Sequence, residues 1–128
     1  MKFTVDIHPF RCGILFCVGM TDKEFELAVR SLNKGDELWG HITKEVSTEV
    51  GPMHAKTLCL PGGEGIIRMH SFKSVYDHGR LIHEIMHAVL HCLRNKDTPI
   101  NEDTEELLCY SVQTIYEQAV EALNGKKK

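Results

Sequence analysis

The sequence predicts a single α+β domain, because short strand-like apolar runs and longer helix-like apolar patterns follow one another along one short chain. The chain has 128 residues, the size of one compact domain with one core. It is 42% hydrophobic and 26% charged, a composition typical of globular proteins. No linker, repeat or low-complexity segment divides residues 1–128. We therefore expect one domain with the element order β-β-α-β-β-α-α.

The first elements are predicted to be a β-hairpin and a capped helix. Residues 2–10 and 12–18 are strand-like runs that meet near Pro9, a residue that suits a turn or a sheet edge. The segment Thr21-Asp22-Lys23-Glu24 is a capping box, and apolar residues follow it at helical spacing. A helix is therefore expected at about residues 22–33.

Residues 35–52 give only a weak signal, in which Trp39, Ile42 and Val46 fit either a loop or a short strand. The following runs, residues 56–60 and 65–70, flank a turn-rich Pro-Gly-Gly-Glu spacer and predict a second hairpin.

Two helices are predicted to complete the chain. Ser74 is an N-cap candidate with Asp77 three residues later, and a long helical pattern runs from there to about residue 94. The last helix is expected to begin near Asn101 or Asp103 and to end at Asn124-Gly125.

Charge and hydropathy exclude two classes of partner. The formal net charge is −3 and the only basic run is at residues 126–128, which gives no basic surface for nucleic acid. The longest apolar run near the start, residues 14–18, is too short for a signal peptide or a membrane span, so we expect a cytoplasmic protein. The five cysteines form no C-x-x-C pair and are expected to be reduced and buried.

The predicted long helix contains the pentad His83-Glu84-Ile85-Met86-His87. The spacing of four residues places His83 and His87 one turn apart on one face, where both imidazoles can bind the same zinc ion. Glu84 lies beside them and can activate a water molecule without being a ligand. We expect the motif to lie on a polar face of the helix. The opposite, apolar arc would consist of Ile82, Ile85, Met86, Val89 and Leu93.

A zinc peptidase needs a third protein ligand and an open fourth position. His91 is two helical turns, about 12 Å, from His83 and is too far away to share the ion. The metzincin pattern is excluded because Leu90 and Leu93 occupy the positions of its glycine and third histidine.

The better source of the third ligand is the acidic run at residues 102–106, before and within the start of the last helix. Most carboxylates at a helix N-terminus only cap the helix or interact with its dipole. Helical projection places Glu105 at the edge of the apolar arc and Glu106 outside it, beside Tyr110. Burial alone would favour Glu105, since a carboxylate on an apolar arc is costly unless it is paired or bound to metal.

The stretch Tyr76–Ala88 and, less closely, Glu105–Tyr110 resemble the minimal gluzincin-like peptidases of phages and other mobile elements, which are related in their motif to thermolysin and to the small peptidases that cleave phage repressors. The resemblance implies a small zincin-like domain whose short sheet packs on the H-E-x-x-H helix. It implies Glu106 as the third ligand, because the family places a glutamate there with an aromatic or acidic residue four positions later. It also implies that a substrate peptide adds to a strand, for which residues 65–70 are the candidate.

Together these features predict a zinc peptidase in which His83, His87 and Glu106 bind Zn²⁺ and Glu84 is the general base. Its partner would be a protein or peptide substrate. Two alternatives remain open: a zinc-stabilised, non-catalytic module that blocks a host protein, and a zinc hydrolase of a non-peptide amide. The donor that would stabilise an oxyanion is unassigned among His70, Tyr76, Arg80 and Tyr110.

Overall fold

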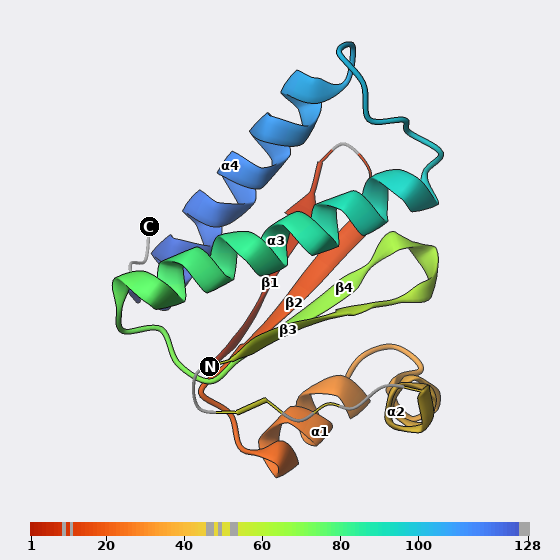
Figure 1. Ribbon diagram of the computed structural model, residues 1–128. Coiled ribbons are helices and arrows are strands. Elements are labelled where there is room, and N and C mark those ends of the chain that lie inside the picture. Colours follow the sequence, from red (N-terminus) through yellow and green to blue (C-terminus); the bar gives the residue numbers. More distant parts are fainter. Residues whose placement is uncertain (9, 11, 46–47, 49, 52–53, 126–128) are drawn as a thin grey trace.

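In the part of the chain that the structure describes, four strands form one mixed sheet with two helices on each face (Figure 1). The computed structural model describes residues 1–8, 10, 12–45, 48, 50–51 and 54–125. The strands are β1 (Lys2–Ile7), β2 (Cys12–Val18), β3 (Ala55–Cys59) and β4 (Gly65–Met69), in the spatial order β1-β2-β4-β3. β1 pairs with β2 and β3 with β4 in antiparallel fashion, whereas β2 and β4 are parallel. β1 and β3 are therefore the edge strands.

The helices are α1 (Asp22–Arg30), α2 (Gly35–Glu45), α3 (Val75–Asn95) and α4 (Glu105–Leu123), and a 3₁₀ turn, η1 (Pro61–Gly63), joins β3 to β4. Helices α1 and α2 cover one face of the sheet, and α3 and α4 cover the other (Figure 1). The α+β class is confirmed. The predicted element order was wrong in one respect, since it lacked α2.

The alternation of side chains along β2 explains the two-sided core. Ile14, Phe16 and Val18 pack toward α3 and α4, while Leu15 and Cys17 pack toward α1 and α2. Because both faces of this central strand are covered, its sequence is almost continuously apolar.

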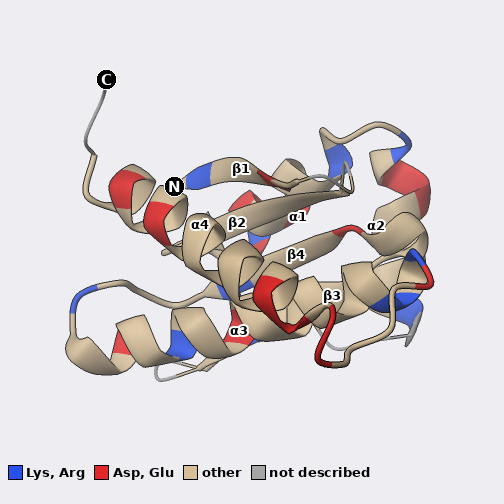
Figure 2. Ribbon diagram, turned by 90° about the horizontal axis from the view of Figure 1, so that it is seen from above, with Lys and Arg blue, Asp and Glu red and all other residues tan. Residues whose placement is uncertain are grey.

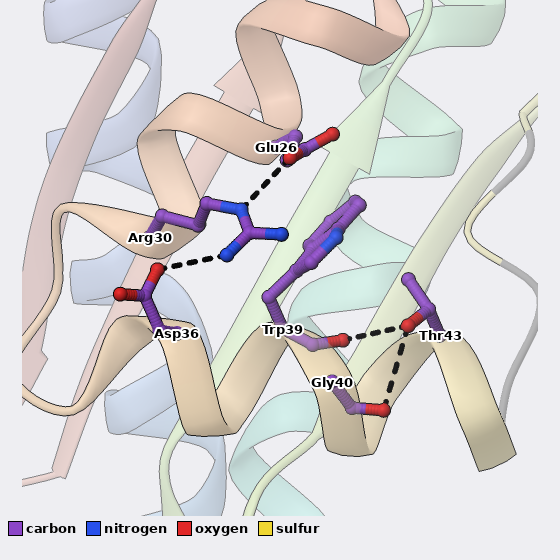
Figure 3. Close-up of polar contacts among 6 residues, drawn as sticks. All are labelled: Glu26, Arg30, Asp36, Trp39, Gly40 and Thr43. Atoms are coloured by element: carbon purple, nitrogen blue, oxygen red, sulfur yellow. Dashed lines mark hydrogen bonds and ion pairs between the residues drawn. The ribbon is translucent and has the colours of Figure 1, made fainter.

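Helix α2 depends on its contacts with α1 more than on its own sequence, since glycines at positions 35 and 40 have low helix propensity. The Trp39 ring packs edge-to-face on Phe25 at 5.8 Å, and the Arg30 guanidinium binds Glu26 and Asp36 at 2.8 Å each, which links the two helices. Figure 3 shows this ion-pair bridge. Val46 and the turn expected at Pro9 lie outside the described residues.

Both predicted capping boxes are present, at Thr21 with Glu24 and at Ser74 with Asp77. Helix α1 ends at Arg30, three residues earlier than expected. Helix α4 begins at Glu105 because the preceding residues form a hydrogen-bonded turn, in which Asn101 Oδ1 accepts from the Asp103 amide at 2.9 Å.

Two further expectations concern membranes and thiols. In the described part of the chain, no helix is long and apolar enough to cross a membrane. All five cysteines are free thiols. Cys12, Cys17 and Cys92 are buried as expected, but Cys59 and Cys109 are exposed, so the expectation of uniform burial was wrong for these two.

Candidate metal centre

His83 and His87 lie together on the outer face of α3, and both side chains are exposed. Their Nε2 atoms are 3.2 Å apart, and the two rings are inclined at 78°. A tetrahedral ion with zinc–nitrogen distances of about 2.0–2.1 Å holds two nitrogens about 3.3–3.4 Å apart. The pair therefore fits two corners of a zinc site with little rearrangement.

Glu84 turns from the same helix toward the sheet and is only 8% exposed. The Thr57 hydroxyl, on the edge strand β3, lies 2.7 Å from Glu84 Oε1 and 3.1 Å from the Glu84 carbonyl oxygen, and donates to them. This contact satisfies a carboxylate that would otherwise be buried at considerable cost. Thr57 thus holds the Glu84 carboxylate on the β3 side of the helix, where Glu84 and His83 line the same hollow.

The buried face of α3 is rotated from the predicted one. The prediction of a single polar face was wrong for Glu84, which is buried beside the sheet. Two residues of the predicted apolar arc, Ile82 and Met86, are 42% and 36% exposed. The rotation arises because the face toward the sheet is lined by Leu81, Ile85, Ala88, Val89, Cys92 and Leu93.

Strand β3 follows α3 in the same direction, so the edge of the sheet accompanies the motif. Ala55 lies near Gly79, Thr57 binds Glu84, and the Leu60 carbonyl oxygen lies 2.6 Å from His91 Nε2. The expectation that residues 65–70 receive the substrate was wrong, because β4 is paired on both sides. The edge beside the motif is β3.

Glu105 and Glu106 stand in the first turn of α4, where acidic residues follow one another (Figure 2), and both are exposed. Within the described ranges, no group of three or more His, Cys, Asp or Glu side chains is close enough to hold one ion. The structure thus brings together His83 and His87, with Glu84 adjacent to His83 in sequence, but brings neither Glu105 nor Glu106 to the pair. Helix α4 diverges from α3 toward this end (Figure 1).

Glu105 continues the row of α4 that faces α3. Leu108 and Cys109 line a groove of about 330 Å³ with Ile82 and Met86. Glu105 lies one turn before Leu108 and Cys109 at helical spacing, whereas Glu106 lies about 100° farther around the helix. The face of α4 therefore gives Glu105 the more favourable position, although the sequence resemblance selects Glu106.

A second hollow, of about 390 Å³, lies on the β3 side of the histidine pair, between β3 and the first turns of α3. Arg80 lines it together with His83 and Glu84. Of the other oxyanion candidates, Tyr76 and Tyr110 are 69% and 62% exposed, and His70 lines a different cavity.

Sequence reasoning missed Thr57 and the cavity residue His54. A threonine in a strand carries no motif, and its contact with Glu84 spans 27 positions of sequence. Only the register of β3 against β4, which pairs Thr57 with Ile67, could have indicated that its side chain is on the α3 face.

No protein-family model matches this chain, and comparisons with curated proteins and with solved structures found no similar protein.

Proposed function

We propose that this protein is a zinc-dependent peptidase of small zincin-like fold, whose centre is the His83/His87 pair with Glu84. The observation that carries the proposal is the combination of two imidazole nitrogens 3.2 Å apart with a carboxylate that Thr57 fixes on the hollow lined by His83. A structural zinc site does not require a carboxylate that is not a ligand, whereas hydrolysis requires a general base, and Glu84 can be that base.

The chemistry divides between the ion and the chain. When bound, zinc would act as a Lewis acid on water and on a substrate carbonyl. His83 and His87 would hold it, with a third ligand from the first turn of α4, either Glu105 or Glu106. Glu84 would take a proton from the attacking water and return it to the leaving amine.

The edge strand β3 is the proposed docking site for an extended peptide. Its outer side has no neighbouring strand among the described residues, and its inner side pairs with β4. A peptide added there would pair along the outer edge of β3 and would pass along α3 beside Glu84.

Zinc content is the first test. We expect close to one zinc per chain by elemental analysis and its loss in His83→Ala. An N–H···N hydrogen bond between two imidazoles also gives a separation of 3.2 Å, so the measurement of metal decides between the two explanations. Metal bound only by the folded state stabilises it by about 4 kcal/mol at a thousandfold excess over Kd, so EDTA should lower the melting temperature. An unchanged melting curve with no metal detected would refute the site.

The second test separates catalysis from binding. Glu84→Gln should retain zinc and lose hydrolysis, since the amide cannot accept the proton. Loss of zinc in this variant would mean that Glu84 is a ligand. A wild-type protein that carries zinc but hydrolyses neither peptides nor simple amides would support the binding-module alternative, and activity on amides alone would support the non-peptide hydrolase.

A further inference from the structure

The hollow between β3 and the first turns of α3 contains an excess of hydrogen-bond donors. Six of the described residues line it: His54, Ala55, Gly79, Arg80, His83 and Glu84. Three of these carry basic side chains, and the one acidic side chain, Glu84, accepts a hydrogen bond from Thr57. The cavity therefore suits an anionic group better than a cationic one.

Arg80 is held in place by its neighbour Asp77. The Arg80 guanidinium donates to Asp77 Oδ1 at 3.2 Å, and its side chain is 28% exposed. Asp77 is itself fixed, because its Oδ2 accepts from the backbone amides of Lys73 and Ser74 at 2.7 and 3.1 Å. These bonds hold the pKa of Asp77 below its usual value, so the anchor is ionised at neutral pH. A guanidinium has five N–H donors, and the contact with Asp77 engages one nitrogen.

The wall beside Arg80 leaves room for a ligand. Among the described residues outside its own helical turn, a Cβ added to Gly79 would meet no heavy atom within 4 Å. The cavity volume of about 390 Å³ is sufficient for an acidic side chain or a chain terminus.

We infer that this cavity binds a carboxylate of the substrate, with Arg80 as the principal recognition residue. The inference rests on the proposed function and specifies its substrate class: a peptide with a carboxylate close to the bond that reaches Glu84. The carboxylate could belong to an Asp or Glu side chain or to the C-terminus of the peptide, and both present the same planar pair of oxygens to a guanidinium.

A binding experiment tests the cavity without requiring activity. The zinc-loaded protein is titrated with N-acetyl-glutamate α-amide, N-acetyl-glutamine and N-acetyl-glutamine amide, which carry a side-chain carboxylate, a terminal carboxylate and no charge. The readout is the NMR shift of the Gly79 amide. We expect shifts from one or both acids, at least tenfold weaker apparent binding of the uncharged amide, and loss of the difference in Arg80→Gln.

Arg94→Gln is the matched control, because Arg94 is exposed near the opposite end of the same helix. It should bind the probes like the wild type, and Arg80→Lys should retain only part of the preference. Equal shifts from all three probes, or carboxylate shifts that persist in Arg80→Gln, would overturn the inference.

A cleavage profile provides the second readout. Digestion of a mixed peptide pool, read by mass spectrometry, should give products with Asp or Glu at one fixed subsite, or cuts at a fixed distance from free C-termini. In the second case, amidation of the C-termini should abolish cleavage. We expect Arg80→Gln to reduce the preference for an acidic over an amide peptide by about tenfold, the size of a partly exposed charge-assisted bond. Cleavage by the wild type without any acidic preference would refute the inference and leave the proposed function standing. Zinc-loaded protein that binds the acidic probes but cleaves no peptide would refute the proposed function and leave the carboxylate site standing.

Discussion

The contact between Thr57 and Glu84 gives a stability prediction that does not depend on any substrate. Thr57→Val keeps the shape of the side chain and its suitability for a strand but removes the hydroxyl that lies 2.7 Å from Glu84 Oε1. Glu84 is 8% exposed, so the loss of this donor leaves a largely buried carboxylate with fewer hydrogen bonds. A hydrogen bond to a charged group contributes about 1.5–3 kcal/mol, and we expect Thr57→Val to lower the free energy of unfolding by about 2 kcal/mol.

A double-mutant cycle isolates the charged component of this bond. In Glu84→Gln the threonine hydroxyl still meets an oxygen, but the bond is neutral and contributes about 0.5–1.5 kcal/mol. Thr57→Val should therefore cost about 1 kcal/mol in that background, which leaves a coupling energy of about 1 kcal/mol. For a chain of this length the wild-type effect corresponds to a fall in melting temperature of roughly 6–10 °C.

The cycle is measured by urea denaturation of all four proteins in the presence of EDTA, so that zinc binding does not contribute to the differences. Thr43→Val is the matched control. The Thr43 hydroxyl donates to the Trp39 carbonyl oxygen at 2.9 Å on the exposed side of α2 (Figure 3), and its loss should change stability by less than about 0.5 kcal/mol. Equal costs of Thr57→Val in both backgrounds, or a cost no larger than that of the control, would refute the assignment.

Other predictions concern the third ligand, the thiols and one glycine. In a competitive chelator titration, Glu105→Gln should weaken zinc binding more than Glu106→Gln, because Glu105 precedes the α4 residues that line the groove with α3 at helical spacing. The reverse order would assign the ligand to Glu106. No effect from either variant would point to another residue. In the native protein, Ellman's reagent should react with the exposed thiols, and with Cys109 before Cys59, because partial burial raises the pKa of Cys59. The buried thiols should react only after unfolding, since burial raises the pKa of Cys17 to about 11 and that of Cys92 to about 12. Fast reaction of all five would contradict the packing. Gly35→Ala should lower the melting temperature, because a Cβ there would lie 2.3 Å from the Arg30 carbonyl oxygen, and an unchanged melting curve would mean that the α1–α2 connection differs.

Short sequence motifs were sufficient to predict those features whose geometry depends on neighbouring residues of the chain. The capping box at Ser74 and Asp77 and the long apolar pattern after it predicted α3 to within one residue at each end. The Pro-Gly-Gly-Glu spacer correctly predicted the hairpin of β3 and β4. The H-E-x-x-H spacing predicted that His83 and His87 share a face, because helix geometry alone fixes that relation.

The sequence was insufficient where the decisive contact comes from elsewhere in the chain. Helix α2 contains two glycines, which lower its helix propensity, and a local sequence pattern cannot predict its packing on Phe25 and Arg30 of α1. The projection of the helix assigned Glu84 to the polar face, and it is Thr57, on a different element, that makes the burial of this carboxylate acceptable. The choice between Glu105 and Glu106 requires the rotation of α4 relative to α3, which no single helix encodes.

The position of Thr57 in an edge strand has a consequence for the length of peptide that the protein would process. If a peptide pairs with β3, it forms hydrogen bonds with the strand that contains Thr57, whose hydroxyl donates to Glu84. Peptides long enough to pair on both sides of position 57 would hold Thr57 in place and so align the Glu84 carboxylate. Shorter peptides would bind at one end of the strand and would leave the position of Thr57 unchanged. The turnover number, more than the binding constant, should then rise abruptly at a threshold length.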